Sequence, residues 1–86
     1  MNVLGFTDRL VEKGFNDAQI REIIAGIEAD VDVHTYCTLN FSAEQMHEIR
    51  LGLEHDISVT AFAKPELSAD QMWILRHVVE GCGSDA

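Results

Sequence analysis

The fold is decided by the stretch QMHEIRLGLEHDISVTAFAKPELSAD, residues Gln45–Asp70, which repeats the 26 residues before it, QIREIIAGIEADVDVHTYCTLNFSAE, residues Gln19–Glu44. Identical pairs in this register are Gln19/Gln45, Glu22/Glu48, Ile23/Ile49, Gly26/Gly52, Glu28/Glu54, Asp30/Asp56, Val33/Val59, Ser42/Ser68 and Ala43/Ala69. Similarity at a fixed period is the signature of repeat architectures. The sequence therefore predicts one domain over residues 1–86, with a half-repeat at 7–18, three imperfect repeats at 19–44, 45–70 and 71–81, and a frayed tail at 82–86.

The first part of each repeat has the pattern of a long helix. Good N-cap residues recur at Asn16, Ser42 and Ser68, and a glutamine follows each of them three positions later, as in a capping box. The apolar residues that follow keep the three- and four-residue spacing of one helical face. The predicted ends of these helices lie near Ala29, His55 and Glu80.

The second part of each repeat has the pattern of a short helix of about two turns, which only packing could hold in place. It is predicted to begin at Asp32 or Ser58, and Thr7–Lys13 is predicted to be the matching N-terminal helix. The expected fold is all-α, a short stack of about six helices in which long and short helices alternate.

Three details refine this picture. Asp30 and Asp56 follow the long helices, where a residue in the left-handed conformation commonly ends a helix. Gly26 and Gly52 recur inside the long helices, at a cost of about 1 kcal/mol each relative to alanine. Their recurrence indicates that a neighbouring helix passes close to them.

The charge of the chain limits its partners. Fifteen acidic residues against six basic ones give a net charge of -9, which disfavours direct contact with nucleic acid or with anionic membranes and favours a basic protein partner. Recurring carboxylates at Glu22, Glu48, Glu28 and Glu54 are expected to form an acidic ladder along the stack. The alternatives are a solvated, solubilising surface and a surface that imitates nucleic acid.

A family resemblance covers Phe15–Val79. The stretches QMHEIRLGLE at 45–54, ISVTAFA at 57–63 and KPELSADQM at 64–72 resemble a degenerate helical repeat of small proteins from gut Firmicutes and their mobile elements. The resemblance implies an architecture and a host, but no activity. This chain departs from the usual pattern at Asp30 and Asp56, where the family has glycine after the long helix.

Catalytic and metal-binding patterns are weak. His34 and Cys37 are the closest histidine–cysteine pair, but nothing marks an oxyanion hole or an orienting group beside them. The histidines and cysteines lack the short spacings of a zinc site. We therefore expect no enzyme activity, no cofactor and no metal. Cys37 and Cys82 lie far apart and no signal peptide precedes them, so a cytoplasmic protein with reduced thiols is expected.

The last repeat departs most from the pattern. It carries Trp73, Ile74 and Val78 where the earlier repeats carry polar residues or glycine. Such a helix is apolar on more than one side, and tryptophan is enriched in the anchors of protein interfaces. The expected function is that of a non-enzymatic protein-binding or self-associating module, with a homodimer through the C-terminal helix as one form. The alternatives are an acidic, nucleic-acid-mimicking inhibitor of a basic enzyme and, for the apolar residues, packing against Val3, Leu4 and Phe6.

Overall fold

The long helices begin at capping boxes. The computed structural model describes the backbone of residues 3–83 and the side chains of residues 7–81. Asn16 caps α2, Asp17–Glu28, and Ser42 caps α3, Ala43–Glu54; in each box the cap accepts from the glutamine amide and the glutamine accepts from the cap amide. Ser68 and Gln71 exchange the same two bonds at the start of α4, Ala69–Gly83. The three predicted capping boxes are confirmed.

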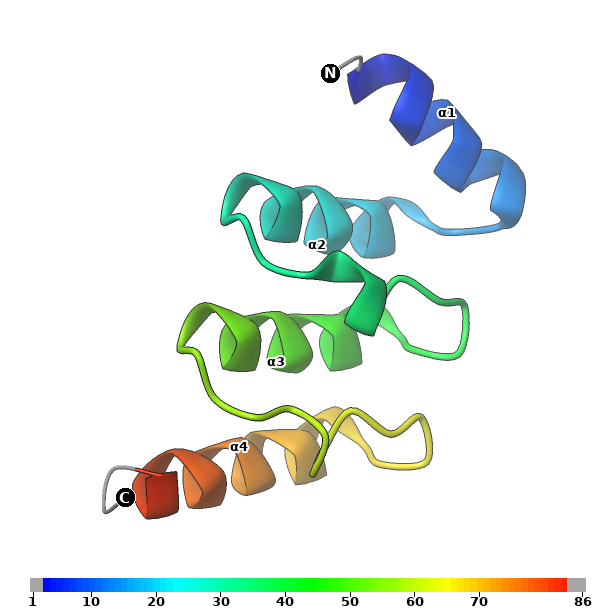
Figure 1. Cartoon of the computed structure of the whole chain (residues 1–86). Coiled ribbons are helices and arrows are strands. Elements are labelled where there is room, and N and C mark those ends of the chain that lie inside the picture. Colours follow the sequence, from blue (N-terminus) through cyan, green and yellow to red (C-terminus); the bar gives the residue numbers. More distant parts are fainter. Residues whose placement is uncertain (1–2, 84–86) are drawn as a thin grey trace.

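The described residues form an all-helical structure without a strand. Helix α1, Val3–Lys13, precedes α2, and a single 3-10 turn, η1, Val33–Thr35, lies between α2 and α3. Figure 1 shows α2, α3 and α4 side by side in one layered arrangement, with α1 at one end and α4 at the other. The molecule is elongated, with extents of 43 × 26 × 15 Å.

The prediction of about six alternating helices is wrong. Asp32 caps only the three-residue η1, and no helix begins at Ser58 within the described chain. Each segment closes one helical turn, in which the amide of Cys37 donates to Val33 O (2.8 Å) and that of Ala63 to Val59 O (2.7 Å). One turn does not propagate, because so short a helix gains too few bonds to offset its nucleation.

The helix ends also correct the sequence-based boundaries. Helix α1 begins at Val3 rather than Thr7, because among the residues before Thr7 only Gly5 opposes a helix. Helix α4 runs through Gly81 to Gly83, since a single glycine lowers helix stability without forcing an end. The predicted frayed tail is therefore wrong at residues 82–83, and its remainder, 84–86, lies outside the described residues. Asp30 and Asp56 have φ values of 61° and 57°, which confirms their predicted left-handed conformation.

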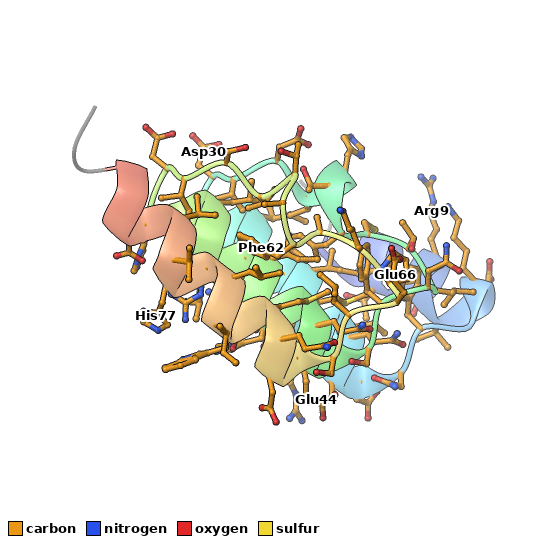
Figure 2. The ribbon with its side chains drawn as sticks, turned by 90° about the horizontal axis from the view of Figure 1, so that it is seen from below. Arg9, Asp30, Glu44, Phe62, Glu66 and His77 are labelled. Atoms are coloured by element: carbon orange, nitrogen blue, oxygen red, sulfur yellow. The ribbon has the colours of Figure 1, made fainter. Side chains whose placement is uncertain are left out.

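The short segments pack on the long helices at the two glycines. A Cβ atom on Gly26 would lie 1.9 Å from Tyr36 Oη, and one on Gly52 would lie 2.7 Å from Phe62 Cζ. The close approach was expected from a neighbouring helix, but it comes from the aromatic ring of the segment that follows. The Tyr36 hydroxyl donates to the Glu22 carbonyl at 2.7 Å. Figure 2 shows Phe62 pointing inward between the helices and the chain that crosses them.

The core runs through the whole stack. Its fully enclosed members are contributed by both the long helices and the short segments, so neither type of element encloses the core alone. The buried apolar residues are Leu10, Phe15, Ile20, Ile23, Tyr36, Phe41, Met46, Ile49, Val59, Phe62 and Met72.

Candidate protein-binding surface

Helix α4 exposes an apolar surface. About half of Trp73 (50%), Ile74 (54%) and Val78 (54%) is accessible to solvent, although Met72 in the same helix is fully buried. Ile74 and Val78 are four residues apart and share one helical face. Trp73 lies on the adjacent face in an edge-on contact with His77, with ring centroids 4.1 Å apart and planes inclined by 61°. The three residues predicted as an apolar anchor therefore lie together on the surface, and we call them the α4 surface.

The corresponding positions of α2 and α3 are occupied by the next helix. Position 74 corresponds to Glu22 and Glu48 in the 26-residue register. Glu22 Oε1 accepts from Arg50 Nε of α3 at 2.8 Å, and Glu48 Oε1 accepts from Arg76 Nε of α4 at 3.1 Å. The α4 surface thus includes the side that, on the other two long helices, receives a following helix.

The glutamines of the capping boxes show the same contrast. Gln19 Nε2 donates to Phe41 O at 2.8 Å, and Gln45 Nε2 donates to Pro65 O at 3.0 Å and also to Leu67 O. Both glutamines are buried because the next segment covers them. Gln71 is exposed, and among the described residues its Nε2 has no acceptor. A polar donor therefore lies open beside the apolar residues of α4.

The N-terminal helix does not cover the α4 surface. Figure 1 places α1 and α4 at opposite ends of the molecule. The side chains of Val3, Leu4 and Phe6 lie outside the described residues, but the helix that carries them is at the far end from Trp73. The alternative of packing between these two groups within one chain is therefore wrong, because two intervening helices separate them.

The predicted acidic ladder is largely neutralised. Glu22 is paired with Arg50 and contacts His47 Nδ1 at 3.3 Å, while Glu54 is paired with Arg50 from the same helix. Although burial disfavours the charged guanidinium, hydrogen bonds and charges from the two carboxylates raise the pKa of Arg50 above its ordinary value. Glu22 therefore joins α2 to α3, whereas Glu54 is engaged within α3. The partner-binding role of both stays a prediction.

Sequence reasoning missed the ion pairs between helices. The pairs Arg50–Glu54 and Arg76–Glu80 are four residues apart within one helix, a spacing that can be read from the sequence, and both are present. The pairs Glu22–Arg50 and Glu48–Arg76 span 28 residues, one repeat period plus two. Arg76 is the more enclosed of the two arginines, with a side chain only 7% exposed. The recurrence of both members at the same offset was the signal that could have found these pairs.

A second group of acids remains unpaired at one edge. Glu28, Asp30, Asp32 and Asp56 are exposed and have no ion pair among the described residues. Glu28 is the last residue of α2, and the three aspartates follow the ends of α2 and α3, where the helix dipole is already negative. Figure 2 shows Asp30 at the edge opposite His77. Of the four predicted acidic partner-binding residues, only Glu28 belongs to this unpaired edge.

A shallow hollow of about 450 Å³ crosses the first turns of the long helices. Its lining combines small alanine side chains with charged residues of α2 and α3. The lining residues are Ala18, Arg21, Glu22, Ala43, Glu44, His47, Glu48 and Ala69. Since Glu22 and Glu48 already hold arginines, the hollow offers few unengaged polar groups for a small ligand.

The chemistry of the described residues gives little support to a catalytic centre. Burial raises the pKa of the Cys37 thiol, which lowers its thiolate fraction, while His34 is exposed. Over the described part of the chain, no three histidine, cysteine, aspartate or glutamate residues are grouped so that they could hold a metal ion. The side chain of Cys82 lies outside the described residues.

Comparisons with known proteins add no relative. Comparison of the chain with protein-family models, with curated proteins and with solved structures finds no match. Within residues 3–83, no helix combines the length and the apolar character needed to cross a membrane. The function must therefore be argued from the surface itself.

Proposed function

We propose that the chain is a short helical-repeat stack that acts as a non-enzymatic protein-binding or self-associating module in the cytoplasm. The observation that carries the proposal is the exposure of Trp73, Ile74 and Val78 together on α4. Three half-exposed large apolar side chains on one helix are costly in water and are typical of an interface core. The exposed side-chain amide of Gln71 adds a hydrogen-bond donor, which would fix the orientation of a partner on this surface.

The proposal is tested by weakening the α4 surface without disturbing the core. Trp73→Ala and Ile74→Glu remove apolar area or add a charge at sites that are half exposed, so both variants should keep the helical circular-dichroism signal. Each should weaken association by about 30-fold or more, the effect of losing one hot-spot residue. Leu39→Glu is the matched control, because Leu39 is equally exposed (56%) but lies outside α4.

The measurement is sedimentation velocity over a wide concentration range, together with capture of partners from a lysate of the source cell. Association that survives both α4 variants, or that is lost equally in the Leu39 control, would contradict the proposal. A chain that stays monomeric and captures no protein would also contradict it.

The alternative function, an acidic inhibitor of a nucleic-acid-binding enzyme, is favoured only by the unpaired edge of Glu28, Asp30, Asp32 and Asp56. It predicts binding to a basic enzyme that weakens steeply as salt rises. Asp30→Lys and Asp56→Lys should then reduce binding, whereas Trp73→Ala should not.

A further inference from the structure

The contacts that join consecutive long helices are of three kinds. The glutamine of the capping box donates to a carbonyl just before the next helix, as from Gln19 to Phe41 O. A glutamate one turn later accepts from an arginine of the next helix, as from Arg50 to Glu22. A glycine four residues after this glutamate receives an aromatic ring of the short segment, as Gly26 receives Tyr36. The same three kinds of contact recur from α3 to α4.

At α4 these three positions hold Gln71, Ile74 and Val78, and all three residues are exposed. The donor is unchanged, but the glutamate has become isoleucine and the glycine has become valine. Helix α4 therefore could not receive another arginine or another deeply inserted aromatic ring. It could receive an apolar side chain in place of the arginine and a smaller side chain in place of the ring.

The other end of the molecule has part of this complementary set. In the same register, Ile24 takes the place of Arg50 and Arg76. Leu10 takes the place of Tyr36 and Phe62, but it is already buried within its own chain and is not open to a second copy. Phe15 takes the place of Phe41 and Leu67, and its carbonyl accepts no hydrogen bond from the described residues. Ile24 is partly exposed. It lies two residues, or about 200° around the helix, from Glu22, which faces α3, so the helix geometry directs Ile24 away from α3. Figure 1 shows α1 at the side of α2 that α3 does not occupy.

We infer that α4 of one copy binds α1 and α2 of a second copy, head to tail, so that the helix order continues from chain to chain. Gln71 donates to Phe15 O of the second copy, and Ile74 packs on Ile24. The substitution at one end thus has its counterpart at the other, since apolar Ile74 meets apolar Ile24 where a glutamate meets an arginine inside the chain. This inference rests on the proposed function and names its partner.

The consequence is an interface between two different surfaces, which propagates into longer assemblies unless it closes into a ring. Each copy carries a net charge of -9, so the copies repel one another at low salt. Because the interface itself is apolar, salt should tighten association by screening this repulsion. An isologous α4–α4 dimer would place Ile74 against α4 of the partner and would not involve Ile24.

The test exchanges the apolar pair for the ion pair that the interior contacts use. Ile74→Glu and Ile24→Arg should each weaken self-association by about 100-fold, because each places a charge against an apolar surface. Mixed together, the two single variants should assemble again with the two chains alternating. Both contacts between unlike chains are then matched, since the two introduced charges meet in one and the two unchanged isoleucines meet in the other. The double variant I24R/I74E should again assemble, within about tenfold of the original affinity.

Sedimentation velocity and light scattering measure these states, and Leu39→Glu should assemble like the original chain. Circular dichroism checks folding, and the reversed pair, Ile24→Glu with Ile74→Arg, replaces the first pair if Ile24→Arg does not fold. A chain that is monomeric at every concentration overturns the inference, and so does an assembly lost in Ile74→Glu but not restored by either double variant. In both cases capture of another protein through Trp73 would leave the proposed function standing. Association unaffected by Ile74→Glu would overturn both.

Discussion

Helices α3 and α4 begin in the same way but differ in what they face. Each starts with a serine–glutamine capping box, and each places an arginine on a glutamate of the helix before it. Helix α3 is then covered by α4, whereas the corresponding side of α4 carries exposed Gln71, Ile74 and Val78. The difference shows that the capping residues determine where a helix begins, independently of what packs on its outer side. The capping box of α4 forms although the side of this helix that carries Ile74 is exposed.

The largest expected effect comes from breaking the contact that joins the two helices. Arg76→Met leaves the Glu48 carboxylate, whose side chain is 12% exposed, without its partner. We expect the free energy of unfolding to fall by about 3 kcal/mol, as when one member of a buried ion pair is removed. Urea denaturation followed by circular dichroism measures this loss. The double variant Arg76→Met with Glu48→Met should recover most of it, and a loss below about 1 kcal/mol in the single variant would show that the pair is effectively solvated.

Substitutions at two glycines, Gly52 and Gly81, compare a helix position that other residues cover with one that is open. Gly52→Ala places a Cβ 2.7 Å from Phe62 Cζ and 2.8 Å from Val59 Cγ1, so the short segment must move. The expected loss is about 2 kcal/mol, typical of overpacking. Gly81→Ala in α4 meets nothing within 4 Å and should raise stability by up to about 1 kcal/mol through helix propensity. Equal effects of the two substitutions, measured by thermal melting, would rule out close packing at Gly52.

The features that could be predicted from the sequence are those encoded within a few residues. The capping box formed by Ser42 and Gln45 depends only on neighbours in the chain, and so does the left-handed conformation of Asp56. Both could therefore be predicted from the sequence. The ion pair of Glu48 and Arg76 was missed because it depends on the register between two helices. The short helices were overpredicted because a cap and an apolar spacing describe how a helix would begin, not whether it propagates.

The candidate site shows the same difference between features that the local sequence encodes and features that depend on how the helices pack. Trp73 and Ile74 were predicted as anchor residues because the earlier repeats carry polar residues at their positions, and both are exposed. Their role in binding stays a prediction. The acidic ladder could not be evaluated from the sequence, since only the structure shows that Glu22 and Glu48 are held by arginines from the next helix.

The glutamines of two capping boxes, Gln45 and Gln71, compare α3 with α4 through a smaller effect on the free energy of unfolding. Gln45→Ala removes one half of the capping box and also the bonds to Pro65 O and Leu67 O, so we expect a loss of about 1.5 kcal/mol. Gln71→Ala removes only its half of the box and should cost about 0.5 kcal/mol. Both values come from urea denaturation of the monomer at low concentration. If Gln71→Ala cost as much as Gln45→Ala there, Gln71 would have a partner within its own chain.

A last comparison tests the two short segments against each other. Tyr36 lies on Gly26 as Phe62 lies on Gly52, so Tyr36→Phe should fit and lose only the 2.7 Å bond to the Glu22 carbonyl. The expected cost is about 1 kcal/mol at pH 8. Burial raises the pKa of Tyr36 above its ordinary value, although the Arg50 charge opposes this.

The raised pKa makes this cost depend on pH. Above about pH 10 the unfolded chain loses the tyrosine proton while the folded chain keeps it, so the folded state binds more protons and stability falls as pH rises. Tyr36→Phe lacks this proton and should lose less stability over the same range, so the difference between the two proteins should shrink above about pH 10. Since Tyr36 is the chain's only tyrosine, ultraviolet titration of the folded protein reports on it alone. A phenol that titrates at its ordinary pKa in the folded protein would contradict the burial of this ring and, with it, the packing that holds the first short segment on α2.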